Sequence, residues 1–162
     1  MTYNEIRAKW REIEPQVIQG IKEGAYSDSY ETIVRNLAKL ILGDSYSDER
    51  FQVIDWGDYQ GTKIFIFAAC YYQPDETDTY IVSNYYGSCS GCDQLLGIVG
   101  YSEELEPISD ENTINDLLSL VRDIYERIRP LSDLQKIPSL TQTINEEGEK
   151  NDKSSGLVTE GD

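Results

Sequence analysis

The sequence predicts an α+β fold in which an N-terminal helical hairpin precedes a three-stranded antiparallel sheet and C-terminal helices pack on one sheet face. Two observations predict it. Apolar residues recur at helical spacing before residue 43 and after residue 110, and the segment between is rich in β-forming residues separated by short polar turns. The 162 residues suffice for one hydrophobic core. We therefore expect a single α+β domain over residues 1–137 and a disordered acidic tail over 138–162, where the periodicity ends.

The first helix is expected over residues 2–23. Thr2 and Glu5 have the spacing of a capping box, and Gly24 marks the end of the helix. Pro15 is expected to kink or split it, because proline removes one backbone donor. The buried stripe consists of Ile6, Trp10, Ile13, Val17 and Ile21.

A second helix is expected between a cap at Asp28 and a terminal glycine at Gly43. The apolar stripe of this helix consists of Tyr30, Ile33, Val34, Leu37 and Ile41. Both helices are amphipathic and joined by a short connection, so we expect them to pack as a hairpin.

Three strands are expected over residues 51–56, 62–72 and 79–87, joined by turns at 57–61 and 73–78. The short connections imply an antiparallel meander. The middle strand is apolar at both even and odd positions over residues 64–70. Such a strand lies at the centre of a sheet, or has helices on one side and a partner on the other.

Two helices are expected after the sheet. Residues 92–100 can form about two helical turns, and a long helix is expected from a cap at Asp110 to about Arg129, before Pro130. The apolar residues of the long helix are Ile114, Leu117, Leu118, Val121, Tyr125 and Ile128.

Charge is the strongest global signal. The chain has 30 acidic and 14 basic residues, a formal net charge of −16 and a pI near 4.2. Such a surface increases solubility, repels nucleic acid and anionic membranes, and attracts basic partners. We therefore predict neither nucleic acid nor a membrane as a direct partner; the sequence indicates no oligomeric state.

The chain contains no histidine, which excludes Ser-His and Cys-His catalytic pairs and imidazole zinc ligands. Walker, Rossmann and HExxH signatures are also absent. We therefore expect a non-enzymatic protein without a cofactor. Three cysteines, an odd number, fit a reducing compartment, and neither a signal-peptide core nor an apolar run of about 20 residues occurs, so we expect a cytoplasmic location.

The CxxC sequence at Cys89 and Cys92 has four interpretations. It can be a redox pair, because a strand, a CxxC and a helix follow one another. It can contribute to a zinc site formed by Cys70, Cys89, Cys92 and Asp93, although structural zinc usually has four Cys or His ligands. It can be structural, with Gly87 allowing a tight turn and Asp93 capping the helix. A backbone nest for an anion is the fourth.

Tyrosine is unusually frequent, with 12 Tyr against 3 Phe. The residues Tyr71, Tyr72, Tyr80, Tyr85 and Tyr86 cluster on two adjacent predicted strands. They indicate either half-buried sheet packing or a protein-binding face, for which we select Tyr71, Tyr80, Tyr85 and Tyr86.

A dense acidic patch precedes the long helix, formed by Glu103, Glu104, Glu106, Asp110 and Glu111. It is either a solvated loop or a set of carboxylates that occupies a cationic groove in place of phosphates. In the second interpretation these five residues contact the partner.

The segments DWGDYQG at 55–61 and YYGSCSGCD at 85–93 resemble a group of small phage and prophage proteins that share a GDYQG…YGSCSGCD pattern. The resemblance covers about residues 51–98 and implies a viral or mobile-element accessory protein, with no catalytic residues to carry over. Small acidic phage proteins often inhibit host defence, including CRISPR nucleases and restriction enzymes. We therefore expect an inhibitor, of the anti-CRISPR or anti-restriction kind, that binds a basic nucleic-acid-handling protein in the host cytoplasm. The alternative is a thiol redox or small-ligand or metal-binding protein that uses Cys89 and Cys92.

Overall fold

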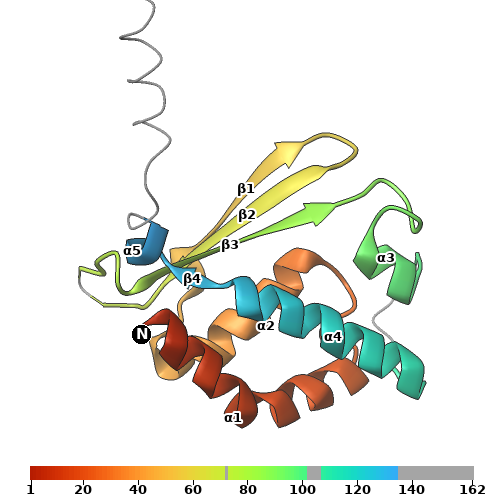
Figure 1. The fold of residues 1–162 in the computed structure, drawn as a ribbon, viewed down its shortest axis with the longest axis horizontal. Coiled ribbons are helices and arrows are strands. Elements are labelled where there is room, and N and C mark those ends of the chain that lie inside the picture. Colours follow the sequence, from red (N-terminus) through yellow and green to blue (C-terminus); the bar gives the residue numbers. More distant parts are fainter. Residues whose placement is uncertain (72, 102–106, 135–162) are drawn as a thin grey trace, which may run out of the picture.

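The computed structural model describes residues 1–71, 73–101 and 107–134, which form an α+β fold as predicted (Figure 1). The elements are α1 (Tyr3–Lys22), α2 (Tyr30–Leu42), the 3-10 turns η1 (Gly43–Ser45) and η2 (Asp48–Arg50), β1 (Phe51–Gly57), β2 (Gly61–Ala68), β3 (Thr79–Tyr86), α3 (Gln94–Val99), α4 (Glu111–Arg127), β4 (Arg129–Pro130) and α5 (Leu131–Leu134). The predicted acidic tail, residues 138–162, lies outside the described residues. Among the described helices, none has both the length and the apolar character that crossing a membrane requires.

Helix α1 begins at the predicted capping box. The Thr2 side chain accepts from the Glu5 backbone N–H, and the Glu5 carboxylate accepts from the Thr2 backbone N–H. The predicted split at Pro15 is wrong, since α1 continues through it to Lys22, while the kink stays a prediction. Pro15 lies on the exposed side of α1, where water can satisfy the carbonyl that loses its helical partner. The chain then leaves the helix through Gly24, which has a positive φ of 81°.

Helix α2 is capped by Ser29, one residue after the predicted Asp28. The Ser29 hydroxyl accepts from the Thr32 backbone N–H, while Asp28 accepts from the Thr32 hydroxyl. The helix ends at Gly43 as predicted, with φ at 55°. Helices α1 and α2 are in contact, but α1 packs more extensively along α4, far away in the sequence.

The sheet is antiparallel with strand order β1-β2-β3-β4. Its fourth strand was not predicted: Pro130 pairs with Tyr80 and Arg129 pairs with Ile81. Helix α4 starts after the predicted cap Asp110 but stops at Arg127. Proline disfavours the helical conformation in the residue that precedes it. Arg129 precedes Pro130, so it is extended and adds to the edge of β3.

Helices α1, α2 and α4 lie together on one side of the sheet (Figure 1). The sheet contributes Phe51, Phe65, Phe67, Tyr80 and Val82 to the core between them. The helices contribute their apolar stripes, including Ile6, Ile13, Ile33, Leu37, Leu117 and Ile124. One hydrophobic core therefore joins the described elements, and it uses only one face of the sheet.

Candidate interaction surface

Nine side chains of the sheet alternate with the core residues and therefore belong to its other face. The pairing register aligns them in three rows across β1, β2 and β3: Trp56, Thr62 and Tyr85; Ile54, Ile64 and Ser83; and Gln52, Ile66 and Ile81. We call these nine residues the open face. Because directly opposed residues in an antiparallel sheet have neighbouring side chains, the nine form one continuous patch.

The open face is apolar, uncharged and accessible. Trp56 is 77% exposed, Tyr85 53% and Ile54 45%. Six of the nine residues are isoleucine or aromatic and none is charged, although 27% of the chain is charged. Contiguous exposed apolar surface is uncommon on soluble proteins and typically marks an interaction site. The open face therefore has the composition of a binding surface.

Strand β2 explains why the sequence is apolar on both faces there. Phe65 and Phe67 are buried under the helices, while Ile64 and Ile66 lie half-buried at the centre of the open face. The central position of β2 is therefore confirmed, and the helices lie on one of its sides; a partner on the other side stays a prediction.

The β1–β2 turn presents a further aromatic residue beside the open face. Gly57 and Gly61 pair across the hairpin, and a Cβ on Gly57 would lie 2.4 Å from the Gln60 carbonyl oxygen. This close approach gives a tight turn that leaves Tyr59 86% exposed, three residues after Trp56. The hairpin end thus offers two accessible aromatic side chains.

Two charged residues of the same hairpin, Asp55 and Lys63, lie on the helix side of the sheet. The Tyr86 hydroxyl donates to Asp55 at 2.8 Å, and the Lys63 ammonium lies 3.6 Å from the other Asp55 oxygen. Lys63 also lies 5.2 Å from the centre of the Tyr86 ring. Donation to the Asp55 carboxylate raises the pKa of Tyr86. The hairpin therefore separates its ion pair from its apolar surface.

The four predicted contact tyrosines do not share one surface. Tyr85 lies on the open face, whereas Tyr86 lies on the helix side. Tyr80 is only 2% exposed and stacks on Phe67 at 5.4 Å, so its predicted contact role is corrected to a core role. Tyr71 is 50% exposed but lies beyond the end of β2. Tyr72 lies outside the described residues.

The sequence interpretation missed most of the open face because it followed tyrosine and acidic residues. The sequence places Trp56, Ile54 and Ile81 in strands but does not show which face of the sheet their side chains belong to. The sequence of β2 carries no alternation that separates the two faces, because it is apolar at both parities; once Phe51 and Phe67 are known to be buried, the residues of opposite parity must face away.

The predicted acidic patch is placed only in part. Glu103, Glu104 and Glu106 lie outside the described residues, and Glu111 is exposed in the first turn of α4. Asp110 caps α4: its carboxylate accepts from the backbone N–H and the hydroxyl of Thr113. These hydrogen bonds hold the pKa of Asp110 below its ordinary value.

The three cysteines do not come together. Cys70 follows β2 near Thr79, and Cys89 and Cys92 follow β3 beyond Tyr86, at the opposite end of the sheet. The predicted zinc set is therefore not assembled, and no group of three or more Cys, Asp or Glu in the described part of the chain can hold a metal ion. Cys89 and Cys92 are exposed free thiols with their sulfur atoms 2.9 Å apart. The hydrogen bond from the Cys89 thiol lowers the pKa of Cys92.

Asp93 serves the structural role that one interpretation gave it. It is 5% exposed, and one oxygen accepts from the Leu96 backbone N–H as the cap of α3. The same oxygen accepts from the Tyr30 hydroxyl at 3.0 Å, and the other accepts from the Gly87 backbone N–H at 2.9 Å. The loop is therefore anchored to α2. Burial, reinforced by the Asp93 charge, raises the pKa of Tyr30 to about 12.

Comparisons of the chain with protein-family models, with curated proteins and with solved structures found no match. The binding role of the open face therefore rests on the composition and exposure of its own residues.

Proposed function

We propose that this protein is a non-enzymatic inhibitor that docks its open face onto a basic, nucleic-acid-handling protein of a host cell. One observation carries the proposal: a chain of net charge −16 leaves one sheet face free of charge and exposes Trp56, Tyr85 and Ile54 on it. Tryptophan and tyrosine dominate the binding energy of protein interfaces, and charged residues are depleted from interface centres.

The charge selects the class of partner. A second copy of this chain would bring two molecules of net charge −16 together, and their repulsion opposes dimerisation through the open face. A basic protein is instead attracted over distances beyond contact, and this attraction raises its association rate. Proteins that handle nucleic acids carry such cationic surfaces. The resemblance to phage accessory proteins supports a host defence protein, such as a CRISPR or restriction nuclease, met in the host cytoplasm.

Affinity capture from a bacterial lysate tests the proposal when the baits are matched. The baits are the unchanged chain, Trp56→Ser, Tyr85→Ser, and Tyr71→Ser as the control. Tyr71 is as exposed as Tyr85, 50% against 53%, but lies outside the open face. We expect a basic protein to be retained by the unchanged chain and by Tyr71→Ser, and lost with the other two. That protein's nuclease activity should then fall when the unchanged chain is added. Equal capture by all four baits would contradict the proposal.

Salt provides a second readout on the same complex. Because the Debye length is about 10 Å at 0.1 M salt and about 3 Å at 1 M, charge attraction between the proteins is largely screened at the higher concentration. We expect the association rate to fall steeply between these conditions. Salt-insensitive association would show that charge does not select the partner.

Thiol chemistry is a second candidate function, favoured by the 2.9 Å separation of the Cys89 and Cys92 sulfur atoms and the lowered pKa of Cys92. Thiolates are the reactive form of cysteine, so a lowered pKa increases reactivity near neutral pH. A thiol titration of the reduced protein tests it: reaction with a disulfide reagent well below the ordinary cysteine pKa favours this function.

A further inference from the structure

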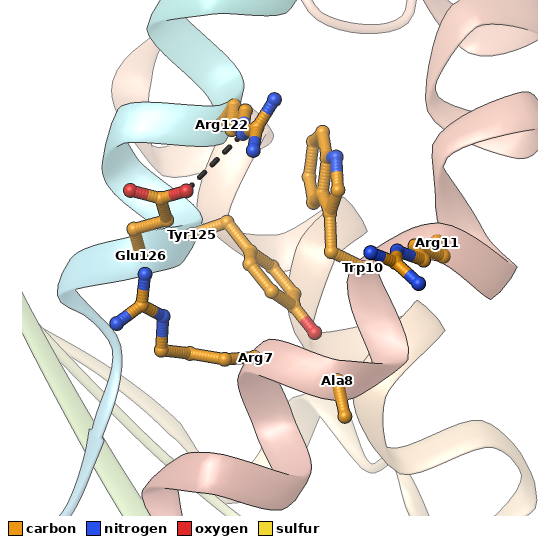
Figure 2. A pocket seen from close by; sticks show the side chains of 7 residues that line it. All are labelled: Arg7, Ala8, Trp10, Arg11, Arg122, Tyr125 and Glu126. Atoms are coloured by element: carbon orange, nitrogen blue, oxygen red, sulfur yellow. Dashed lines mark hydrogen bonds and ion pairs between the residues drawn. The ribbon is translucent and has the colours of Figure 1, made fainter.

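A pocket of about 440 Å³ lies along the packed helices α1 and α4, away from the sheet. It is lined by Arg7, Ala8, Trp10, Arg11, Arg122, Tyr125 and Glu126 (Figure 2). This volume falls in the range of pockets that hold small ligands. The pocket differs from the rest of the protein in its charge, because it gathers three arginines in a strongly acidic protein.

Two of the three arginines, Arg7 and Arg11, have no ion-pair partner among the described residues. Arg122 pairs with Glu126 at 3.1 Å, but Arg11 makes no ion pair or hydrogen bond within the described part of the chain. Arg7 lies 5.4 Å from the centre of the Tyr3 ring and has no carboxylate partner among the described residues. The four charged lining residues therefore sum to +2, three arginines against one glutamate.

The arrangement costs stability in the absence of a ligand. Arg7 and Arg11 are four residues apart on α1, a spacing at which like charges repel by a few tenths of a kcal/mol. Arg122, on α4, lines the same pocket, with its guanidinium 5.9 Å from the centre of the Trp10 ring (Figure 2). An anion between the two helices would remove this repulsion.

Two packed aromatic rings form one wall of the pocket. Trp10 packs on Tyr125 with ring centres 4.9 Å apart, and the Tyr125 hydroxyl donates to the Ile6 carbonyl of α1. Trp10 is 6% exposed, and its Nε1–H has no hydrogen-bond partner among the described residues. Buried donors are nearly always paired, but this nitrogen is enclosed and does not open onto the pocket, so the inference below rests on the arginines.

We infer that this pocket binds a small multivalent oxyanion, held by the guanidinium groups of Arg7, Arg11 and Arg122. Guanidinium forks match the oxygen pairs of phosphate and carboxylate, and such charge-assisted hydrogen bonds are strong. The small size follows from the net charge of −16: a nucleic acid would extend onto the surrounding acidic surface and be repelled, whereas a small anion meets a lining whose net charge is +2.

Tryptophan fluorescence gives a direct test, because the chain has two tryptophans and Trp56 can be removed. In a Trp56→Phe background, Trp10 is the remaining reporter, and it is titrated with pyrophosphate and, separately, with citrate at constant ionic strength. We expect a saturable change in Trp10 emission with at least one of them. Binding of pyrophosphate alone assigns a phosphate-bearing ligand, and binding of citrate alone assigns a carboxylate.

Matched variants in the same background decide whether the arginines hold the anion. Arg11→Gln and Arg122→Gln should each raise the dissociation constant about tenfold or more. Arg50→Gln, an exposed arginine of η2 outside the pocket, should leave it unchanged. Circular dichroism should show that Arg11→Gln folds normally, because it removes a like-charge pair. No saturable binding of either anion, or unchanged binding in the two pocket variants, would overturn the inference.

Discussion

Trp56 and Tyr85 lie in one row of the sheet, on either side of Thr62, and both belong to the face opposite the helices. Along the same strand as Tyr85, the core face holds Tyr80, stacked on Phe67. Two tyrosines five residues apart on β3 therefore serve different purposes, because strand residues of opposite parity face opposite sides. Tyr80 stabilises the fold, and Tyr85 is available for binding.

If the open face is free surface, Trp56→Ser leaves the free energy of unfolding almost unchanged, within about 0.5 kcal/mol. Phe65→Ala, on the buried face of the neighbouring strand β2, should instead lower it by about 3–5 kcal/mol, because Phe65 is fully buried. Urea unfolding measured by circular dichroism compares the two variants. A large loss of stability in Trp56→Ser would show that the protein itself covers the open face.

The two glycines of the CxxC loop should respond differently to alanine. A Cβ on Gly87 would lie 2.4 Å from the Cys92 carbonyl oxygen, a backbone atom that cannot move cheaply, whereas a Cβ on Gly91 meets nothing closer than the Cys89 sulfur at 4.0 Å. We expect Gly87→Ala to lower the melting temperature by several degrees, equivalent to about 1–3 kcal/mol. Gly91→Ala is the matched control and should change it little. Equal effects would mean that the close contact at Gly87 does not constrain the loop.

The sequence predicted the fold class, the long helices and three of the strands because periodicity and capping are local. The caps at Thr2 and Asp110 and the ends at Gly24 and Gly43 need only neighbouring residues. The fourth strand needs Arg129 to meet Ile81, which only the packing of α4 determines.

The candidate site was harder to predict because it, too, depends on how distant segments pack together. Tyrosine counts do not separate Tyr80 from Tyr85; that requires knowing which face of β3 the helices cover. The pairing of α1 with α4, which creates the arginine pocket, joins residues more than 100 positions apart. Neither relationship is encoded in local spacing.

Buried tyrosines should make the fold sensitive to alkali. Burial raises the pKa of Tyr26, Tyr30, Tyr80 and Tyr125 from 10.0 to about 12. A group whose pKa is higher in the folded state stabilises the fold fully below its unfolded pKa, and this contribution is lost as the pH rises through the folded pKa. The contribution of these tyrosines to stability should therefore be constant below about pH 10 and fall between about pH 10 and 12.

Tyr26→Phe is the control for this pH dependence. Tyr26 is 3% exposed and makes no side-chain hydrogen bond within the described residues, so the change removes a titrating group and little else. Denaturant unfolding at a series of alkaline pH values should show a shallower decline for Tyr26→Phe. An identical decline in both proteins would contradict the assignment.

Mild oxidation should join Cys89 to Cys92 within one chain and leave Cys70 as a free thiol. The two sulfur atoms are already 2.9 Å apart, whereas Cys70 lies at the other end of the sheet. Peptide mapping without reductant, after alkylation, identifies the linked peptides. A bridge from Cys70 to either loop cysteine would contradict the arrangement of strands described above.

Site-specific photo-crosslinking in host cells tests the binding account most directly. A photoreactive amino acid replaces Ile54, in the middle row of the open face, and in a control protein it replaces Tyr101, which is 71% exposed outside that face. The account predicts a discrete adduct from position 54 to one basic, nucleic-acid-handling protein and no such adduct from position 101. An adduct from position 101 alone, or adducts from position 54 only to a second copy of this chain, would contradict it.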